Sequence, residues 1–66
     1  MLLTVNGEKL DFSDGNTVRQ LLERLHLADR PVAVEQNGRI VPYSTFAQTE
    51  LTDGDSIEVV TLVGGG

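Results

Sequence analysis

The segment MLLTVNGEKLDF (residues 1–12) predicts the β-hairpin from which the rest of the fold can be worked out. Its centre, Asn6-Gly7, is the dipeptide that best tolerates the positive φ angles of a two-residue type I′ turn. Pairing Val5 with Glu8 across this turn places apolar side chains on one face, namely Met1, Leu3, Val5, Leu10 and Phe12. Because such alternation is typical of a half-buried antiparallel pair, the hairpin predicts a sheet with one face in the core.

The next segment predicts one amphipathic helix. Thr17 and Gln20 have the spacing of a capping box, which satisfies free backbone amides at a helix start. Apolar positions then recur at helical spacing, namely Val18, Leu21, Leu22 and Leu25. Arg19 and Glu23 are four residues apart and can pair on the exposed side. We expect the helix to end at residues 28–31, since they close with a proline and the residue before a proline disfavours helical geometry.

The remaining chain predicts three strands. Residues 32–36 and 39–41 flank a second Asn-Gly pair, Asn37-Gly38, and Pro42 should stop the second of these strands. Residues 56–63 form the most strand-prone segment. The resulting order is typical of the α+β class, with one helix packed across one face of a small mixed sheet. The order of the strands within the sheet does not follow from this spacing.

Two short segments connect these strands, and a glycine tail follows the last one. Tyr43 and Phe46 are spaced for one helical turn and are expected to close the end of the core, while residues 53–55 predict a turn. The last predicted strand runs directly into three glycines. We therefore divide the chain into a domain of residues 1–63 and a flexible C-terminal tail of residues 64–66.

Length and composition exclude several classes of function. A chain of 66 residues makes one small domain and is too short for a deep, walled active site. The absence of cysteine excludes disulfides, a thiolate nucleophile and a cysteine-based zinc site. Ten acidic against five basic residues give a net charge of -5, which disfavours nucleic acid as a partner. No apolar run approaches the length of a membrane span, so we expect a cytoplasmic protein.

Few residues suggest catalysis or metal binding. His26 is the only histidine, and at a predicted helix C-terminus it is better explained by the helix dipole than as a metal ligand. Asp53 and Asp55 lack the spacing of a calcium loop and predict a turn. The four arginines are dispersed among acidic residues, which is typical of a solvated surface. We therefore expect neither a metal site nor an enzyme.

The last strand and the glycine tail each allow two interpretations. If Ile57 and Val59 face the helix, together with residues 61 and 63, then Val60 and Leu62 lie on the opposite face. Exposed apolar side chains there indicate either a docking surface or an ordinary edge effect. Residues 64–66 are either a frayed terminus or a thin arm whose carboxylate another protein can approach closely, since glycine lacks a Cβ.

The motifs taken together resemble the ThiS family of sulfur carriers of thiamine biosynthesis, which belong to the small ubiquitin-like β-grasp proteins. The resemblance covers essentially the whole chain and rests on the two Asn-Gly turns, the single helix, Ile40-Val41-Pro42, Phe46, Asp53-Gly54-Asp55, Ile57-Glu58-Val59-Val60 and Gly65-Gly66. It implies a β-grasp fold in which the first and last strands pair in parallel at the sheet centre. The chain departs from some members in having a third glycine, Gly64, before the terminal pair.

The resemblance also implies how the protein works. A ThiF-type adenylyltransferase would use ATP to adenylate the carboxylate of Gly66, with Gly64 and Gly65 giving reach. Sulfur from a cysteine desulfurase system would then give a thiocarboxylate, which thiazole synthase would consume. The protein would be a covalent carrier with no bound cofactor, so its partners would supply the chemistry.

Two alternatives remain open at this point. The small subunit of molybdopterin synthase is also a β-grasp carrier ending in Gly-Gly, although those chains tend to be longer. From a different class, the chain could be a non-covalent β-grasp interaction module whose tail is inert.

Overall fold

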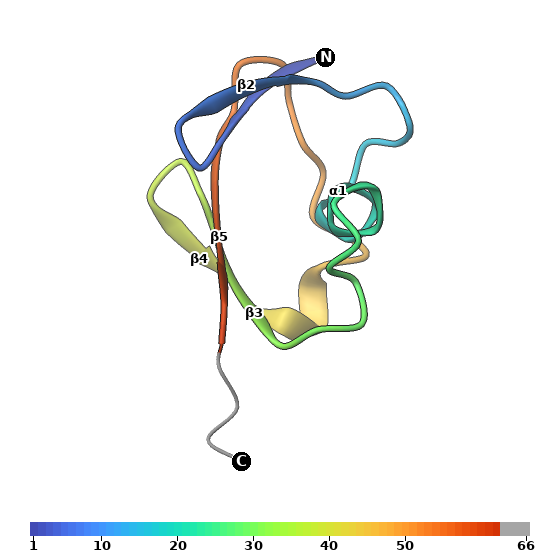
Figure 1. Ribbon diagram of the computed structural model, residues 1–66, viewed down its shortest axis with the longest axis vertical. Helices are drawn as coiled ribbons and strands as arrows, with labels where there is room; N and C mark the ends of the chain where they lie inside the picture. The colour runs from blue at the N-terminus through green and yellow to red at the C-terminus, as the bar shows by residue number, and fades with distance from the viewer. Residues whose placement is uncertain (63–66) are drawn as a thin grey trace.

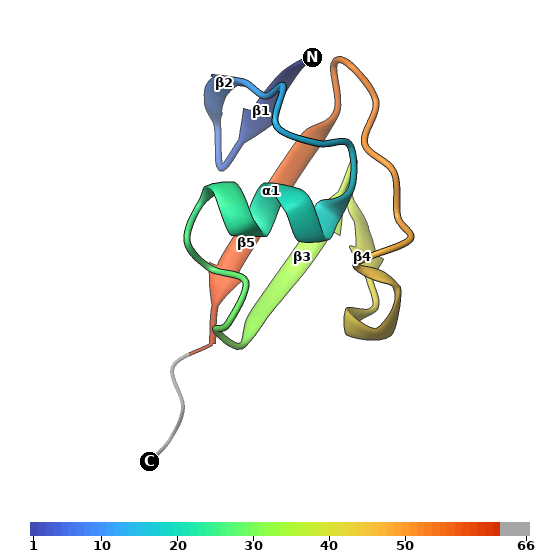
Figure 2. The same cartoon turned by 90° about the vertical axis from the view of Figure 1, so that its right-hand side faces the viewer.

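The protein forms a five-stranded mixed sheet with one helix across one face (Figures 1 and 2). The computed structural model describes residues 1–62, so the predicted end of the last strand at Val63 and the tail of residues 64–66 lie outside the described residues. The elements are β1 (Leu2–Val5), β2 (Glu8–Asp11), α1 (Val18–Arg24), β3 (Val32–Gln36), β4 (Arg39–Val41), the short 3₁₀ helix η1 (Tyr43–Thr45) and β5 (Ser56–Thr61). The strands lie in the order β2-β1-β5-β3-β4. This confirms the predicted α+β class.

The N-terminal hairpin has the predicted register. Val5 pairs with Glu8 and Leu3 with Leu10, which places Leu3 in the core at 0% exposure. β1 also pairs in parallel with β5, so the first and last strands of the described chain are neighbours inside the sheet. This pairing is the one that the resemblance implied.

Helix α1 begins where predicted but ends earlier. Thr17 and Gln20 form the capping box, and Arg19 and Glu23 form the ion pair at 3.5 Å. The prediction that the helix extends to residues 28–31 is wrong, because α1 ends at Arg24.

A left-handed residue explains this early end. His26 has a φ of 61°, and its N–H donates to the carbonyl of Glu23 at 3.1 Å. The N–H of Leu27 donates to the carbonyl of Leu22 at 2.8 Å, which completes a Schellman motif. Leu27 thereby turns back to pack against the core, so its burial stabilises the early stop.

The core lies between α1 and the sheet, and one predicted member is missing from it. Its buried apolar residues are Leu3, Phe12, Val18, Leu21, Leu22, Val34, Val41, Phe46, Leu51, Ile57 and Val59. Phe46 closes one end of this core as expected, but Tyr43 does not, since it is 79% exposed. The Tyr43 ring instead packs edge-on against Phe46, with 5.4 Å between ring centroids. In the described part of the chain, no helix has the length and apolar character needed to cross a membrane.

Candidate functional site

Strand β5 is the element that leads to the glycines singled out from the sequence. It is hydrogen-bonded on both edges, in parallel to β1 and antiparallel to β3. Ile57 and Val59 face the core at 0% and 7% exposure, which confirms the prediction for these two residues. Thr61, predicted for the same side, is exposed, and Val63 lies outside the described residues. Residues 64–66 follow β5 in sequence but are not among the described residues. The structure therefore provides a firmly held strand directly before the predicted arm.

The asparagine side chains of the two Asn-Gly turns form hydrogen bonds with the two edges of β5. The N–H of Val59 donates to Oδ1 of Asn6 at 2.7 Å, and Nδ2 of Asn6 donates to the Val59 carbonyl at 3.1 Å. On the other edge, the N–H of Ser56 donates to Oδ1 of Asn37 at 2.9 Å. Each side chain thus continues the hydrogen-bond ladder beyond the end of the neighbouring strand. Sequence reasoning identified both turns but missed this second role of their asparagines.

Asp55 is a buried carboxylate that links the second Asn-Gly turn to the loop before β5. It is 9% exposed, and its oxygens accept from Nδ2 of Asn37, Nε2 of Gln36 and the N–H of Thr52, each at 2.9 Å. Burial acts to raise the pKa of Asp55, but the hydrogen bonds from Asn37, Thr52 and Gln36 together outweigh it and hold the pKa below its usual value of 3.8. The sequence predicted only a turn here, because partners 18 and 19 residues away leave no local signal.

The outer face of the sheet, opposite α1, exposes apolar side chains. Val60 is 57% exposed and Leu62 is 52% exposed, which confirms the predicted exposure of both. Ile40 on β4 is exposed at 78%, and Ala33 pairs directly with Val60 across β3 and β5. Leu62 and Tyr43 both border an open hollow of about 430 Å³ near the end of β5. Ile40 is thus an exposed apolar residue of this face that sequence reasoning did not assign to it, while Tyr43 borders the hollow together with the loop that follows α1.

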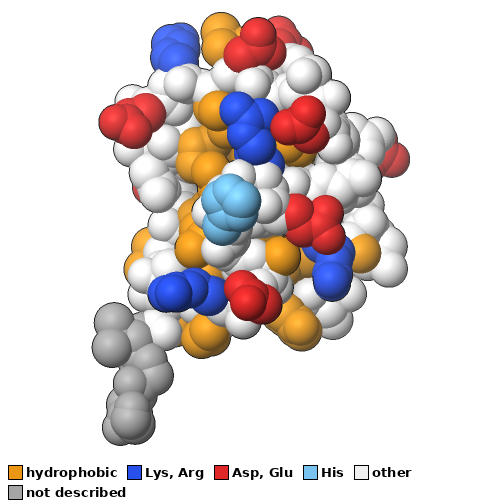
Figure 3. Space-filling view, turned by 45° about the vertical axis from the view of Figure 1, so that its right-hand side comes forward, with side chains coloured by type: hydrophobic (Ala, Val, Ile, Leu, Met, Phe, Trp, Pro, Cys, Tyr) orange, Lys and Arg blue, Asp and Glu red, His pale blue; other side chains and the backbone are white. Residues whose placement is uncertain are grey.

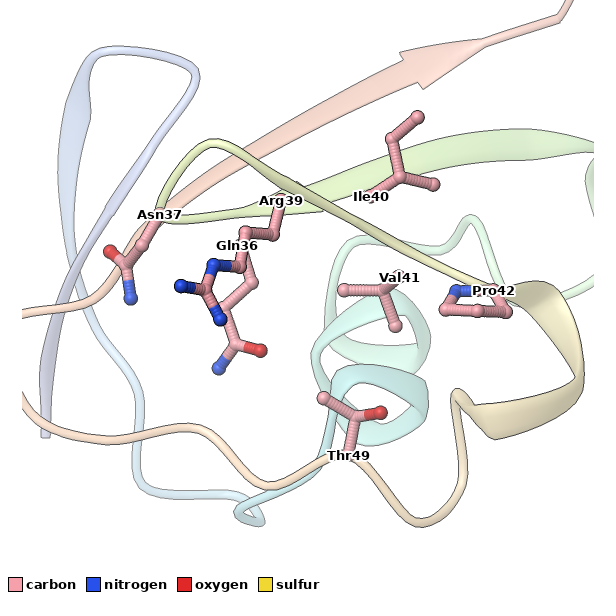
Figure 4. Close-up of a pocket in the computed structure, with 7 residues that line it drawn as sticks. All are labelled: Gln36, Asn37, Arg39, Ile40, Val41, Pro42 and Thr49. Atoms are coloured by element: carbon pink, nitrogen blue, oxygen red, sulfur yellow. The ribbon is translucent and has the colours of Figure 1, made fainter.

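A second hollow, of about 530 Å³, lies beneath β4 (Figure 4). Arg39 and Gln36 point the same way, toward the loop that carries Thr49, whereas Ile40 points away. Nε2 of Gln36 already donates to the carbonyl of Glu50 at 3.0 Å and to Asp55. This polar lining therefore serves to join the loop to the sheet.

The predicted metal and charge patterns can also be compared with the structure. Within residues 1–62, no three His, Cys, Asp or Glu side chains come together as a group that could hold a metal ion. His26 is exposed, in the turn that ends α1. Around the histidine, Figure 3 shows basic and acidic side chains interspersed over the surface. This agrees with the prediction that the arginines lie on a solvated surface.

Comparison with known proteins identifies relatives that match the whole chain. The model of the ThiS family matches residues 2–66. The chain is 48% identical over 66 residues to a thiazole synthase of Paramagnetospirillum magneticum, but it spans only 20% of that protein's length. It is 36% identical to the sulfur carrier protein ThiS of Bacillus subtilis, with 98% of this chain and 100% of that relative aligned.

A solved structure matches equally completely. The crystal structure of the thiamine biosynthesis protein ThiS from Geobacter metallireducens has a TM-score of 0.80 and 38% identity, and the match covers 100% of both chains. Together with the mixed sheet and the single helix, this similarity confirms the β-grasp fold.

Proposed function

The chain belongs to the ThiS family of sulfur carriers of thiamine biosynthesis, and we propose that the carboxylate of Gly66 is the group that carries the sulfur. The observation that supports this proposal most strongly is that the family match extends to residue 66 and so includes the terminal glycines. Val59, five residues before Gly64, is held by the Asn6 side chain, so the arm follows a fixed strand.

The proposed chemistry takes place on partner enzymes. A ThiF-type adenylyltransferase lets the Gly66 carboxylate attack the α-phosphorus of ATP, and pyrophosphate leaves. A persulfide sulfur, supplied by a cysteine desulfurase system, then attacks the acyl carbon, and AMP leaves. A thiol cleaves the remaining sulfur–sulfur bond, which leaves a thiocarboxylate on Gly66. Thiazole synthase takes up this sulfur, and the carboxylate returns.

In this cycle the chain acts as a carrier and not as an enzyme. The domain of residues 1–63 presents the arm, and residues 64–66 form the part that enters a narrow active site. Glycine suits that role because it has no Cβ and lets other backbones approach closely. ATP is used by the activating enzyme, so the carrier binds no cofactor of its own. We place the cycle in the cytoplasm.

Val60 and Leu62 are proposed as the docking residues for the activating enzyme. Both are more than half exposed, and they lie four and two residues before Gly64, where the arm begins. Apolar exposure of this kind on a small protein is typical of a protein-binding surface when neighbouring residues extend it, as Ile40 does here. The thiazole synthase relative, whose sequence includes a segment similar to this whole chain, supports thiazole synthase as the second partner.

The proposal is tested by intact mass spectrometry of the protein after incubation with a ThiF-type enzyme, ATP, and a desulfurase with cysteine and a thiol. We expect exchange of one oxygen for sulfur in the wild type and none in the variant lacking Gly65 and Gly66. Both proteins should show the same circular dichroism spectrum. A wild type that stays unmodified would contradict the proposal, and a tail-less variant that still binds every partner would favour the non-covalent module.

The docking assignment is tested with Leu62→Asp. We expect weaker binding to the activating enzyme with the fold retained, because Leu62 is 52% exposed. Loss of the fold would show that Leu62 has a structural role. Sulfur transfer to a molybdopterin synthase large subunit, and none to thiazole synthase, would favour the other class of carrier.

A further inference from the structure

Two glutamates lie directly opposite each other on the outer face of the sheet. Glu35 on β3 pairs with Glu58 on β5, and both side chains are exposed. Directly paired residues of antiparallel strands have Cβ atoms about 4.5–5.5 Å apart, and like charges at this spacing destabilise the sheet. The fold itself therefore gains nothing from having two carboxylates at these positions.

In the described part of the chain, the basic side chains leave this pair without an ion-pair partner. Within residues 1–62, neither Glu35 nor Glu58 forms an ion pair. Lys9 is the one basic residue of the described strands whose side chain alternates onto the same face, but it lies on β2, with β1 between it and β5. Strand spacing and rise place its Cα about 12 Å from that of Glu58. Arg39 belongs to the neighbouring edge strand, but Figure 4 shows its side chain pointing to the opposite side from Ile40.

Apolar side chains flank the glutamate pair on two sides. Ala33 and Val60 form the next cross-strand pair on the same face, and Ile40 pairs with Glu35 from β4. Val60 and Ile40 are 57% and 78% exposed. An apolar surface with an unneutralised carboxylate pair at its edge is complementary to an apolar partner surface that presents a cation.

We propose that Glu35 and Glu58 together receive an arginine of the activating enzyme when it docks on the outer face of the sheet. A guanidinium fits better than an ammonium, because its planar fork can donate to both carboxylates at once. This inference rests on the proposed function, since it specifies how the partner recognises the surface that includes Val60. It predicts that the pair lowers the stability of the free carrier and raises its affinity for the enzyme.

The test compares Glu35→Gln, Glu58→Gln and the double variant with the wild type. Binding to the ThiF-type enzyme is measured by titration, and stability of the free carrier by thermal unfolding. We expect each single variant to raise Kd about ten-fold, as for a charged contact at an interface. The double variant should raise the Tm of the free carrier by about 2–5 °C, because the repulsion is removed. A purely structural role would lower both affinity and Tm.

The matched control is Glu50→Gln, which removes the same charge from a loop residue that forms no ion pair within residues 1–62. Its Kd should stay within about two-fold of the wild type, because the loop of Glu50 bridges Thr17 on the α1 side of the sheet and so lies off the outer face. Equal weakening by Glu50→Gln would overturn the inference and indicate net charge alone. Wild-type affinity in the double variant would also overturn it. If instead the wild type is never adenylated, the proposed function fails.

Discussion

The two Asn-Gly turns of this molecule have the same backbone geometry but bind β5 in different ways. Asn6 and Asn37 have φ angles of 51° and 52°, and the glycines that follow have φ angles of 83° and 82°. The Asn6 side chain exchanges two hydrogen bonds with the backbone of one residue, Val59. The Asn37 side chain accepts one bond from the backbone of Ser56 but donates its other bond to the carboxylate of Asp55.

This difference shows that the asparagine of the same turn motif can have two structural roles. At the first turn, the asparagine satisfies neutral backbone groups at the end of a parallel ladder. At the second turn, it also stabilises the charge of a buried residue, since Asp55 is 9% exposed. Hydrogen bonds to a charged group contribute more than those between neutral groups. Substitutions that change the charge should therefore alter the free energy of unfolding by different amounts at the two turns. Substitutions that only restrict the backbone should alter it by the same amount at both.

The largest difference is expected between Asn37→Asp and Asn6→Asp. The first substitution places a second carboxylate 2.9 Å from Oδ1 of Asp55 and should lower the free energy of unfolding by about 2–4 kcal/mol. The second removes one donor to a backbone carbonyl and should lower it by about 1 kcal/mol. Urea denaturation of both variants at neutral pH measures the difference. Equal losses would show that the Asp55 contact adds nothing.

The next largest effect is the pH dependence of the stability that Asp55 contributes at the second turn. The folded-state pKa of Asp55 is lowered, so its contribution to stability is present above the unfolded pKa and is lost as the pH falls through the folded pKa. Asp55→Asn should lower the free energy of unfolding by about 1–2 kcal/mol at neutral pH. The difference in unfolding free energy from the wild type should narrow as the pH falls below about 4, because the unfolded chain then binds a proton at Asp55 more readily than the folded protein does. A gap that is constant from neutral to acid pH would contradict this interpretation.

The backbone of the two turns should respond equally. Gly7 and Gly38 both have positive φ, and a Cβ at either position would have open space around it. Gly7→Ala and Gly38→Ala should therefore each lower the free energy of unfolding by about 1–2 kcal/mol, from left-handed backbone strain alone. Thermal unfolding of the two variants under the same conditions measures the loss of stability in each. Unequal losses would mean that the turns are not equivalent.

The smallest effect concerns a third left-handed residue, His26, which lacks the side-chain bonds of the two asparagines. His26→Gly should raise the free energy of unfolding by about 0.5–1 kcal/mol, because glycine adopts a φ of 61° without a Cβ penalty. Such a gain corresponds to a rise in Tm of about 2–8 °C in a domain of this size. His26→Ala serves as the control, since it retains the Cβ. A gain of the same size in the alanine variant would assign the effect to the imidazole and not to the backbone.

Features of local origin could be predicted from the sequence, and features made by distant residues could not. The register of the first hairpin followed from Asn6-Gly7 and the alternation around it, and the start of α1 followed from Thr17 and Gln20. The end of α1 was missed, because Leu25 continues the apolar stripe. The left-handed conformation of His26 and the packing of Leu27, which end the helix, leave no signal in the local sequence.

The candidate site divides in the same way. The exposure of Val60 and Leu62 was predictable from the two-residue period of a strand. The position of Asp55 at the centre of a hydrogen-bond network could not be predicted, because its partners Gln36 and Asn37 belong to the hairpin of β3 and β4, far away in sequence. That Glu35 lies opposite Glu58 could not be predicted either. It depends on the pairing of β3 with β5, which the spacing of the segments along the chain does not determine.

The central position of β5 has a consequence for synthesis on the ribosome. β5 joins β1 to β3, and the Asn6 side chain reaches a residue 53 positions later in the chain. Until Ser56–Thr61 has left the exit tunnel, the two hairpins have no strand to connect them, and isolated hairpins are marginal in water. The sheet therefore cannot form until β5 has been synthesised and released from the tunnel, and a chain that stops before β5 lacks the strand that joins its two hairpins.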